Sequence, residues 1–179
     1  MAWHTRSTRT AYENPWIRVR EDQVTHPDGS DSLYGVVELR PAVFVVALDD
    51  DDRVALIEID RYTVGTSLEV PGGGSDNEEP LLAAQRELLE ETGLEASVWT
   101  QLGDVWALNG AAHAREHVFL ARNLSQKTDA GHTQLEEGIS GVRFVPFGEA
   151  TAMIGAGEIT DNETIAALAL AGIRLGRFA

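Results

Sequence analysis

The sequence has 179 residues, of which 43% are hydrophobic, so it is long enough and apolar enough for one globular domain with a small appendage. Its 14 basic and 29 acidic residues give a formal net charge of −15, which disfavours binding to nucleic acid or to an anionic membrane. The absence of cysteine excludes disulfides and thiolate metal sites. The first ten residues are polar and the longest apolar stretch, Pro41 to Leu48, is too short to span a bilayer, so we expect a cytoplasmic protein.

The N-terminal part of the chain has the pattern of an antiparallel β-hairpin. Trp16–Arg20 alternates apolar and polar residues, as a half-buried strand does, and Leu33–Leu39 is expected as its partner. Pro27–Asp31 between them has the composition of a turn. A proline then separates this unit from the rest. We therefore expect residues 1–40 to form a hairpin and residues 41–179 to form the main domain.

The main domain alternates between strand and helix patterns. Strand patterns are found at Val43–Leu48, Val54–Ile59, Leu68–Val70, Trp99–Leu108, His117–Ala121 and Val142–Pro146. Helix patterns are found at Leu81–Thr92, Glu149–Gly155 and Thr164–Leu175, the last with Asp161 as its N-cap. The consecutive acids Asp49–Asp52 are expected in a solvated turn, with metal binding as the alternative, and Leu124–Thr133 in a polar loop. Strands interleaved with helices predict a mixed α/β sandwich.

The first expected helix gathers acidic side chains on one face. Glu87, Glu90 and Glu91 stand at positions i, i+3 and i+4, and three like charges this close destabilise an isolated helix. A divalent cation such as Mg²⁺ would compensate them, because it prefers oxygen ligands. Ala84 and Leu88 lie on the opposite, apolar face, so the acids need not face the core. The alternative is an ordinary solvated helix face.

A glycine-rich loop precedes this helix, and glycines allow a backbone to approach a metal or a phosphate closely. The chain reads Gly72, five residues, Glu78, seven residues, and then Arg-Glu-Leu-Leu-Glu-Glu-Thr-Gly-Leu from Arg86 to Leu94. This segment resembles the complete Nudix box, with every defining position filled. The resemblance implies a Nudix-type α/β/α sandwich with a mixed sheet.

The resemblance also implies roles for the residues of the box. The metal, Mg²⁺ or Mn²⁺, would be held by Glu87, Glu90, Glu91 and a backbone carbonyl near Gly72 or Gly73. Arg86 would fix the glutamates through charge-assisted hydrogen bonds, and Glu78 would pair with Arg86. The bound metal would neutralise a diphosphate and activate a water molecule.

A carboxylate outside the box is expected to act as the general base. Glu136 and Glu137 stand in a Gln-Leu-Glu-Glu-Gly loop before the last strand, where relatives of the sugar-diphosphate type carry a catalytic glutamate, and Glu137 is preferred. Glu116 also matches a recurrent family position and is expected near the metal or the substrate. The alternative for each is an ordinary acid of a loop or strand.

A longer part of the chain resembles the ADP-ribose and nucleotide-sugar pyrophosphatases within this family. The resemblance covers Ile59–Gly65 and Leu68–Gly72, and it implies that Arg61 binds the diphosphate with Glu69 beside it. The alternative for Arg61 is a salt bridge to Glu69 or Asp60. A proline that these relatives place after the box is missing from the segment 106–113, which leaves the sugar open.

The N-terminal strands of this subgroup build a homodimer, so a homodimer is expected here. Trp16 and Tyr34 are candidates for stacking on a base, with core packing as the alternative. We expect hydrolysis of the diphosphate bond in a nucleoside diphosphate linked to a sugar, without nucleic-acid or membrane partners. The alternatives are a non-catalytic nucleotide-sugar sensor and a nucleoside triphosphate pyrophosphatase.

Overall fold

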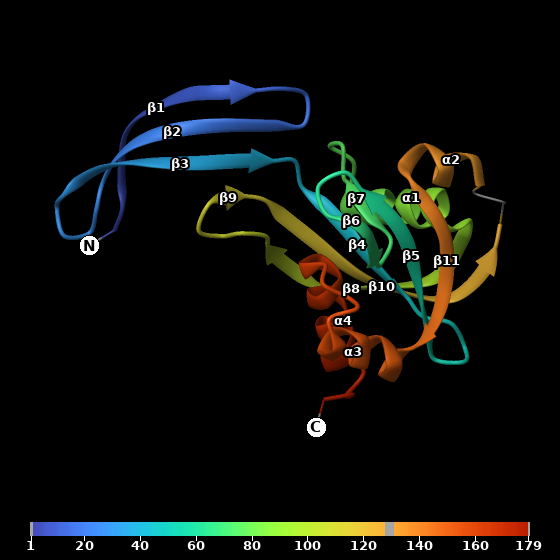
Figure 1. Cartoon of the computed structure of the whole chain (residues 1–179). Helices are drawn as coiled ribbons and strands as arrows, with labels where there is room; N and C mark the ends of the chain where they lie inside the picture. Colours follow the sequence, from blue (N-terminus) through green and yellow to red (C-terminus); the bar gives the residue numbers. More distant parts are fainter. Residues whose placement is uncertain (1, 128–130, 179) are drawn as a thin grey trace. The chain divides into compact units, whose positions relative to one another are not determined.

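The computed structural model describes residues 2–127 and 131–178, and the chain folds as two compact units (Figure 1). The first unit contains the chain up to Pro41 together with Trp106–Arg115. The second contains Ala42–Val105 and the chain from Glu116 onward. Within the described residues, no helix combines the length and the apolar character needed to cross a membrane.

The first unit is a small sheet with the strand order β1-β2-β3-β9. Its strands are β1 (His4–Glu13), β2 (Ile17–Thr25), β3 (Asp31–Leu39) and β9 (Ala112–His113). The antiparallel pairing of β2 with β3 confirms the expected hairpin, and Gly29, with φ of +89°, lies in its turn. The additional strand β1 was not expected, because its sequence is polar on both faces. Backbone pairing with β2 and the ion pair of Arg9 with Glu21 hold it instead.

The second unit contains the remaining helices and strands. They are β4 (Ala42–Ala47), β5 (Arg53–Arg61), β6 (Gly65–Glu69), β7 (Gly72–Gly74), α1 (Pro80–Thr92), β8 (Leu94–Trp106), β10 (Arg115–Gln126), α2 (Gly131–Glu137), β11 (Ile139–Pro146), α3 (Phe147–Ala156) and α4 (Asn162–Arg174). One sheet has the order β7-β4-β10-β8 and is mixed, because β4 runs parallel to β10 and antiparallel to β7. The other has the order β11-β5-β6 and is antiparallel.

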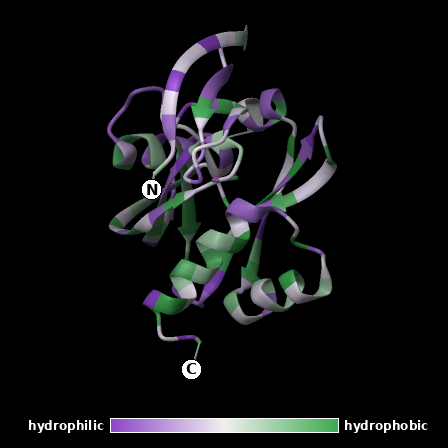
Figure 2. Ribbon diagram, turned by 90° about the vertical axis from the view of Figure 1, so that its left-hand side faces the viewer, coloured by the Kyte–Doolittle hydropathy of each residue, from purple (hydrophilic) through white to green (hydrophobic). Residues whose placement is uncertain are grey.

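Helices cover both faces of the central strands, which confirms the expected α/β/α sandwich. Alternate residues of β4 point to opposite faces, so Val43 and Val45 pack in the same core as α1, whereas Val46 packs with α3 and α4. These strand side chains are fully buried. Apolar residues are correspondingly concentrated on the central strands and on the C-terminal helices (Figure 2).

Helix α1 begins and ends where the sequence predicts. Pro80 occupies its first turn, and the side chain of Glu79 accepts hydrogen bonds from the N–H groups of Leu81 and Leu82. Gly93 ends the helix in the left-handed conformation, with φ of 73°. The apolar face of the helix, including Leu88, is fully buried against the sheet.

Two expected loops form regular structure instead. The glycines Gly72–Gly74 form the short strand β7, because they pair with residues of β4. The segment expected as a polar loop over Leu124–Thr133 continues strand β10 to Gln126 and enters helix α2 at Gly131, while residues 128–130 lie outside the described residues. The expected turn at Asp49–Asp52 is present, with an Asp49 carboxylate oxygen accepting from two backbone N–H groups of the turn.

A buried threonine ties the last helix to the connection that leads into β7. Asp161 caps α4 by accepting a hydrogen bond from the N–H of Thr164 at 2.8 Å, as the sequence predicts. The Thr164 hydroxyl then accepts from the N–H of Val70 at 2.9 Å, and its side chain is fully buried. Val70 directly precedes Pro71 and the glycine loop, so this bond fixes the position at which the loop begins.

We expect Thr164→Val to destabilise the protein. The substitution keeps the shape of the side chain but leaves the buried N–H of Val70 without an acceptor, at a cost of about 1–3 kcal/mol in the free energy of unfolding. Denaturant unfolding measures this loss. Thr151→Val is the control, because the Thr151 hydroxyl bonds the exposed carbonyl of Gly148. Equal stabilities of the two variants would contradict the assigned role of Thr164.

Candidate active site

The acidic face of α1 is largely buried. The exposed fractions of Glu87 and Glu91 are 6% and 2%, whereas Glu90 is half-buried. The sequence predicts that these acids need not face the hydrophobic core, and neither Glu87 nor Glu91 belongs to a hydrophobic core cluster, although both are buried. They are buried because the glycine strand β7 packs on α1 and covers the turn that carries the carboxylates.

Each glycine of β7 makes a different close approach to the acidic face. The N–H of Gly72 donates to Oε2 of Glu91 at 2.7 Å. A Cβ at Gly73 would lie 2.6 Å from Oε1 of Glu87, so only glycine leaves room for that carboxylate. The carbonyl of Gly74 accepts from Nη2 of Arg86 at 3.0 Å. The strand therefore holds the acidic face by backbone contacts, and at Gly72 and Gly73 a Cβ would obstruct them.

Arg86 connects the acids of the helix with the acid of the loop. Its Nε donates to Glu78 at 3.0 Å, so the ion pair expected between these two residues is present. Its Nη1 donates to Glu87 at 2.8 Å and to Glu90 at 2.9 Å. These charge-assisted bonds fix the glutamate side chains in place and offset part of their mutual repulsion.

Burial perturbs the acidity of the two enclosed carboxylates. Desolvation raises the pKa of Glu91 to about 9, against the opposing hydrogen bond from Gly72. Desolvation also raises the pKa of Glu87, against the neighbouring charge of Arg86. The negative charge of Glu137 contributes to both increases. Negative charge at this position is therefore under-compensated by the protein's own groups.

The donor set fits a hard divalent cation in its chemistry. Buried carboxylate oxygens are the ligands that Mg²⁺ prefers, and a cation would relieve the desolvation of Glu87 and Glu91. Glu90 is less buried than these two acids, and it shares the Nη1 donor of Arg86 with Glu87. In residues 2–127 and 131–178, no group of three or more His, Asp or Glu side chains forms a ready-made cation site. The roles of Glu87, Glu90, Glu91 and a carbonyl near Gly72 as metal ligands therefore stay predictions.

The candidates for the general base occupy different places. Glu136 and Glu137 lie at the exposed end of α2, which is a correction to the loop expected there. Gln134, which the sequence did not single out, docks α2 by donating to the carbonyl of Glu91 at 2.7 Å. Glu116 lies in β10, and the charges that act on it come from Asp161 and Glu163 rather than from the box glutamates.

Arg61 forms the salt bridge to Glu69 that the sequence offered as an alternative. Its Nε and Nη2 contact the two carboxylate oxygens at 3.2 Å and 2.6 Å. Both residues also line an open cavity of about 310 Å³, which leaves Arg61 accessible to a phosphate. The other lining residues are Phe44, Thr63, Val64, Asp161 and Glu163.

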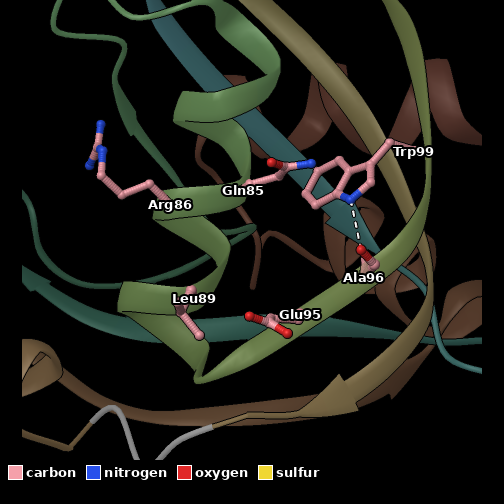
Figure 3. Close-up of a pocket in the computed structure, with 6 residues that line it drawn as sticks. All are labelled: Gln85, Arg86, Leu89, Glu95, Ala96 and Trp99. Atoms are coloured by element: carbon pink, nitrogen blue, oxygen red, sulfur yellow. Dashed lines mark hydrogen bonds between the residues drawn. The ribbon is translucent and has the colours of Figure 1, made fainter.

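A second cavity, of about 420 Å³, lies beside α1 and does not include the buried carboxylates. Its lining residues are Gln85, Arg86, Leu89, Glu95, Ala96 and Trp99 (Figure 3). The indole N–H of Trp99 is already bonded to the carbonyl of Ala96, so the ring offers the cavity an apolar surface. The acidic site is thus distinct from this cavity, which shares only Arg86 with it.

The two aromatic candidates of the first unit, Trp16 and Tyr34, differ in how far they are buried. Trp16 is 66% exposed in the connection between β1 and β2, so core packing within the chain is wrong for it. Tyr34 is half-buried and lies edge-on to Trp3, with 5.6 Å between the ring centroids. The stacking of Trp16 or Tyr34 on a base stays a prediction.

Comparison with known protein families identifies the one to which this sandwich fold and its glycine loop belong. The NUDIX domain matches residues 38–168, so the chain belongs to the Nudix family. The nucleoside diphosphate sugar hydrolase N-terminal domain matches residues 3–37. The protein is therefore a Nudix hydrolase with the N-terminal extension found in nucleotide-sugar hydrolases.

Two relatives and one solved structure show which proteins this chain is similar to. An ADP-ribose pyrophosphatase of Mycobacterium tuberculosis (strain ATCC 25618 / H37Rv) is 35% identical over 92% of this chain and 80% of its own length. A GDP-mannose pyrophosphatase of Escherichia coli O1:K1 / APEC is 34% identical over 56% of this chain and 53% of its own length. The crystal structure of an ADP compounds hydrolase shares the fold, with a TM-score of 0.85 over 99% of this chain and 96% of that one, at 20% identity.

Proposed function

We propose that the protein hydrolyses the diphosphate bond of a nucleoside diphosphate linked to a sugar, of the ADP-ribose or nucleotide-sugar type. The products would be a nucleoside monophosphate and a sugar phosphate. The observation that carries this proposal is the pair of buried carboxylates, Glu87 and Glu91, enclosed by the glycine strand β7. The relatives' names support the same substrate class.

The residues of this chain would divide the work of the reaction. Glu87 and Glu91 would hold Mg²⁺, or Mn²⁺, which supplies charge neutralisation of the diphosphate and activation of water. Arg86 would keep the carboxylates oriented, and Arg61 would contact the diphosphate through its fork of donors. Glu137 would accept the proton of the attacking water, because it is an exposed carboxylate whose charge acts on both Glu87 and Glu91. Glu136 is the alternative base.

The finer expectations from the sequence belong to the same proposal. Magnesium is supported by the all-oxygen donor set. A homodimer would bury exposed aromatic side chains of the first unit, such as Tyr12 and Trp16, and light scattering would measure its mass. The substrate would be a small molecule, with neither nucleic acid nor membrane as a partner, and the protein would act in the cytoplasm.

A substrate panel tests the proposed reaction. We expect that the protein, incubated with Mg²⁺ and ADP-ribose, ADP-glucose or GDP-mannose, releases a nucleoside monophosphate from at least one of them, as chromatography of the products would show. Adding EDTA in excess should stop the reaction. Tight binding without turnover would favour a sensor, and faster cleavage of a nucleoside triphosphate would favour the triphosphate pyrophosphatase. Either result would contradict the proposal.

A further inference from the structure

Three acidic side chains meet at the N-terminus of α4, outside the Nudix box. Asp161 is the N-cap of this helix and Glu163 lies in its first turn. Glu116 reaches them from β10, where it is paired in register with Ala42 of β4. The three acids act on one another electrostatically, since Asp161 and Glu163 contribute to the pKa of Glu116 and Asp161 and Glu116 contribute to the pKa of Glu163. The capping of α4 explains Asp161, but it does not require either glutamate.

The carboxyl group of Glu116 is buried but incompletely hydrogen-bonded. Its side chain is only 5% exposed, yet its Oε2 has no hydrogen-bond partner in the described part of the chain. Buried polar atoms are nearly always hydrogen-bonded, so an unpaired carboxyl oxygen at this depth needs a donor from elsewhere. Burial raises the pKa of Glu116 and the pKa of Glu163, because it disfavours their charged forms.

The adjacent cavity has an excess of acceptors over donors. Asp161 and Glu163 form part of the wall of the 310 Å³ cavity that also holds Arg61 and Glu69. Arg61 is the only cationic residue of that wall, and its guanidinium is already bonded to Glu69. A ligand that donates hydrogen bonds fits this wall, whereas a carboxylate or a second phosphate would meet acids of its own charge.

The cavity also lies close to the box. The charges of both Glu91 and Asp161 act on the guanidinium of Arg61, and Arg61 shares the cavity wall with Asp161 and Glu163. A diphosphate held near Glu91 and Arg61 would therefore direct one of its two substituents toward Glu163. That substituent would be the group whose hydroxyls the acids accept.

We propose that Glu163, supported by Asp161 and Glu116, selects nucleotide sugars whose sugar is neutral and rich in hydroxyl groups, and rejects those whose sugar carries a carboxylate. This inference rests on the proposed function and adds a specificity residue to it. Glu163 accepts hydrogen bonds from the sugar and repels an anionic one, so it acts on the choice of substrate and not on the chemical step.

Two substrates that differ only in the sugar test this assignment. GDP-mannose and GDP-mannuronate differ by a carboxylate on the sugar, and kcat/KM for each gives a preference ratio. We expect the wild-type protein to prefer GDP-mannose, Glu163→Gln to lower this ratio by about tenfold, and Glu163→Lys to lower it further. Glu149→Gln is the matched control, because Glu149 is exposed in the first turn of α3 and should leave the ratio unchanged.

The outcomes separate this inference from the proposed reaction. Hydrolysis by the wild-type protein with the same preference ratio in Glu163→Gln would overturn the role of Glu163 and leave the proposed function intact. Without turnover of either sugar, the same ratio is measured as dissociation constants by calorimetry with Ca²⁺. Absence of binding to both compounds would overturn the inference as well. Circular dichroism verifies that each variant is folded, since a merely structural role for Glu163 would lower both rates without changing their ratio.

Discussion

Glu91→Gln is expected to remove nearly all hydrolysis while leaving the metal-free protein at least as stable as the wild type. Glu91 is the most deeply buried acid of the box, and its carboxylate lies close enough to Glu87 for the two to repel each other. Glutamine has the same shape, and its side-chain oxygen can still accept the N–H of Gly72. The substitution thus removes the cost of burying an acid that is ionised in the unfolded chain, without opening a cavity.

Glu91→Gln is expected to lower kcat/KM but not the melting temperature of the metal-free protein. Changes to residues that merely support a metal ligand cost about 10–100-fold in activity or affinity, so loss of a direct ligand should cost at least about 100-fold in kcat/KM. In EDTA, the melting temperature should stay equal or rise by roughly 2–4 °C, corresponding to about 1 kcal/mol. Addition of Mg²⁺ should raise the melting temperature of the wild type and not that of the variant.

The matched control for this prediction is Glu95→Gln. Glu95 is a partly exposed acid just beyond α1 and forms an ion pair with Lys127, so neither activity nor the response to Mg²⁺ should change by more than a small factor. A wild-type rate in Glu91→Gln would refute its role as a metal ligand. So would an undiminished stabilisation of that variant by Mg²⁺.

The parts of the site that the sequence predicts are those with local causes. Helix α1 follows from its apolar spacing, from Pro80 in the first turn and from Gly93 at its end, all within one short segment. The spacing of the acids likewise fixes which of them share a face. The Nudix resemblance then supplies their expected roles, because the box is itself a continuous stretch of chain.

The parts that the sequence did not predict depend on contacts between distant segments. Periodicity shows which residues share a face of α1 but not that β7 covers Glu87 and Glu91, because β7 is placed by its pairing with β4. The polar strand β1 has no apolar period and forms through its pairing with β2. The meeting of Glu116 with Glu163 joins β10 to α4, and nothing local in either segment indicates it.

The second large effect, a loss of activity, is expected for Gly73→Ala, because Gly73 lies in the strand β7 that covers Glu87. A Cβ at this position would lie 2.6–2.8 Å from the carboxylate atoms of Glu87. The end of a glutamate side chain can rotate away, so the free energy of unfolding should change by less than about 1 kcal/mol. The displaced carboxylate would no longer meet the metal, and kcat/KM should fall by about 10–100-fold.

Gly74→Ala provides the matched control, because it adds the same methyl group one residue later in the same strand. The nearest atom to a Cβ at Gly74 is a carboxylate oxygen of Asp76 at 3.5 Å, which is an ordinary contact. Activity and the concentration of Mg²⁺ at half-maximal rate should therefore change little in Gly74→Ala, while Gly73→Ala should need more Mg²⁺. Equal effects of the two substitutions would show that the loop tolerates side chains, and that the close approach of β7 does not position Glu87. An effect confined to Gly73→Ala would instead show that the close approach of the β7 backbone positions the carboxylate of Glu87 for the metal.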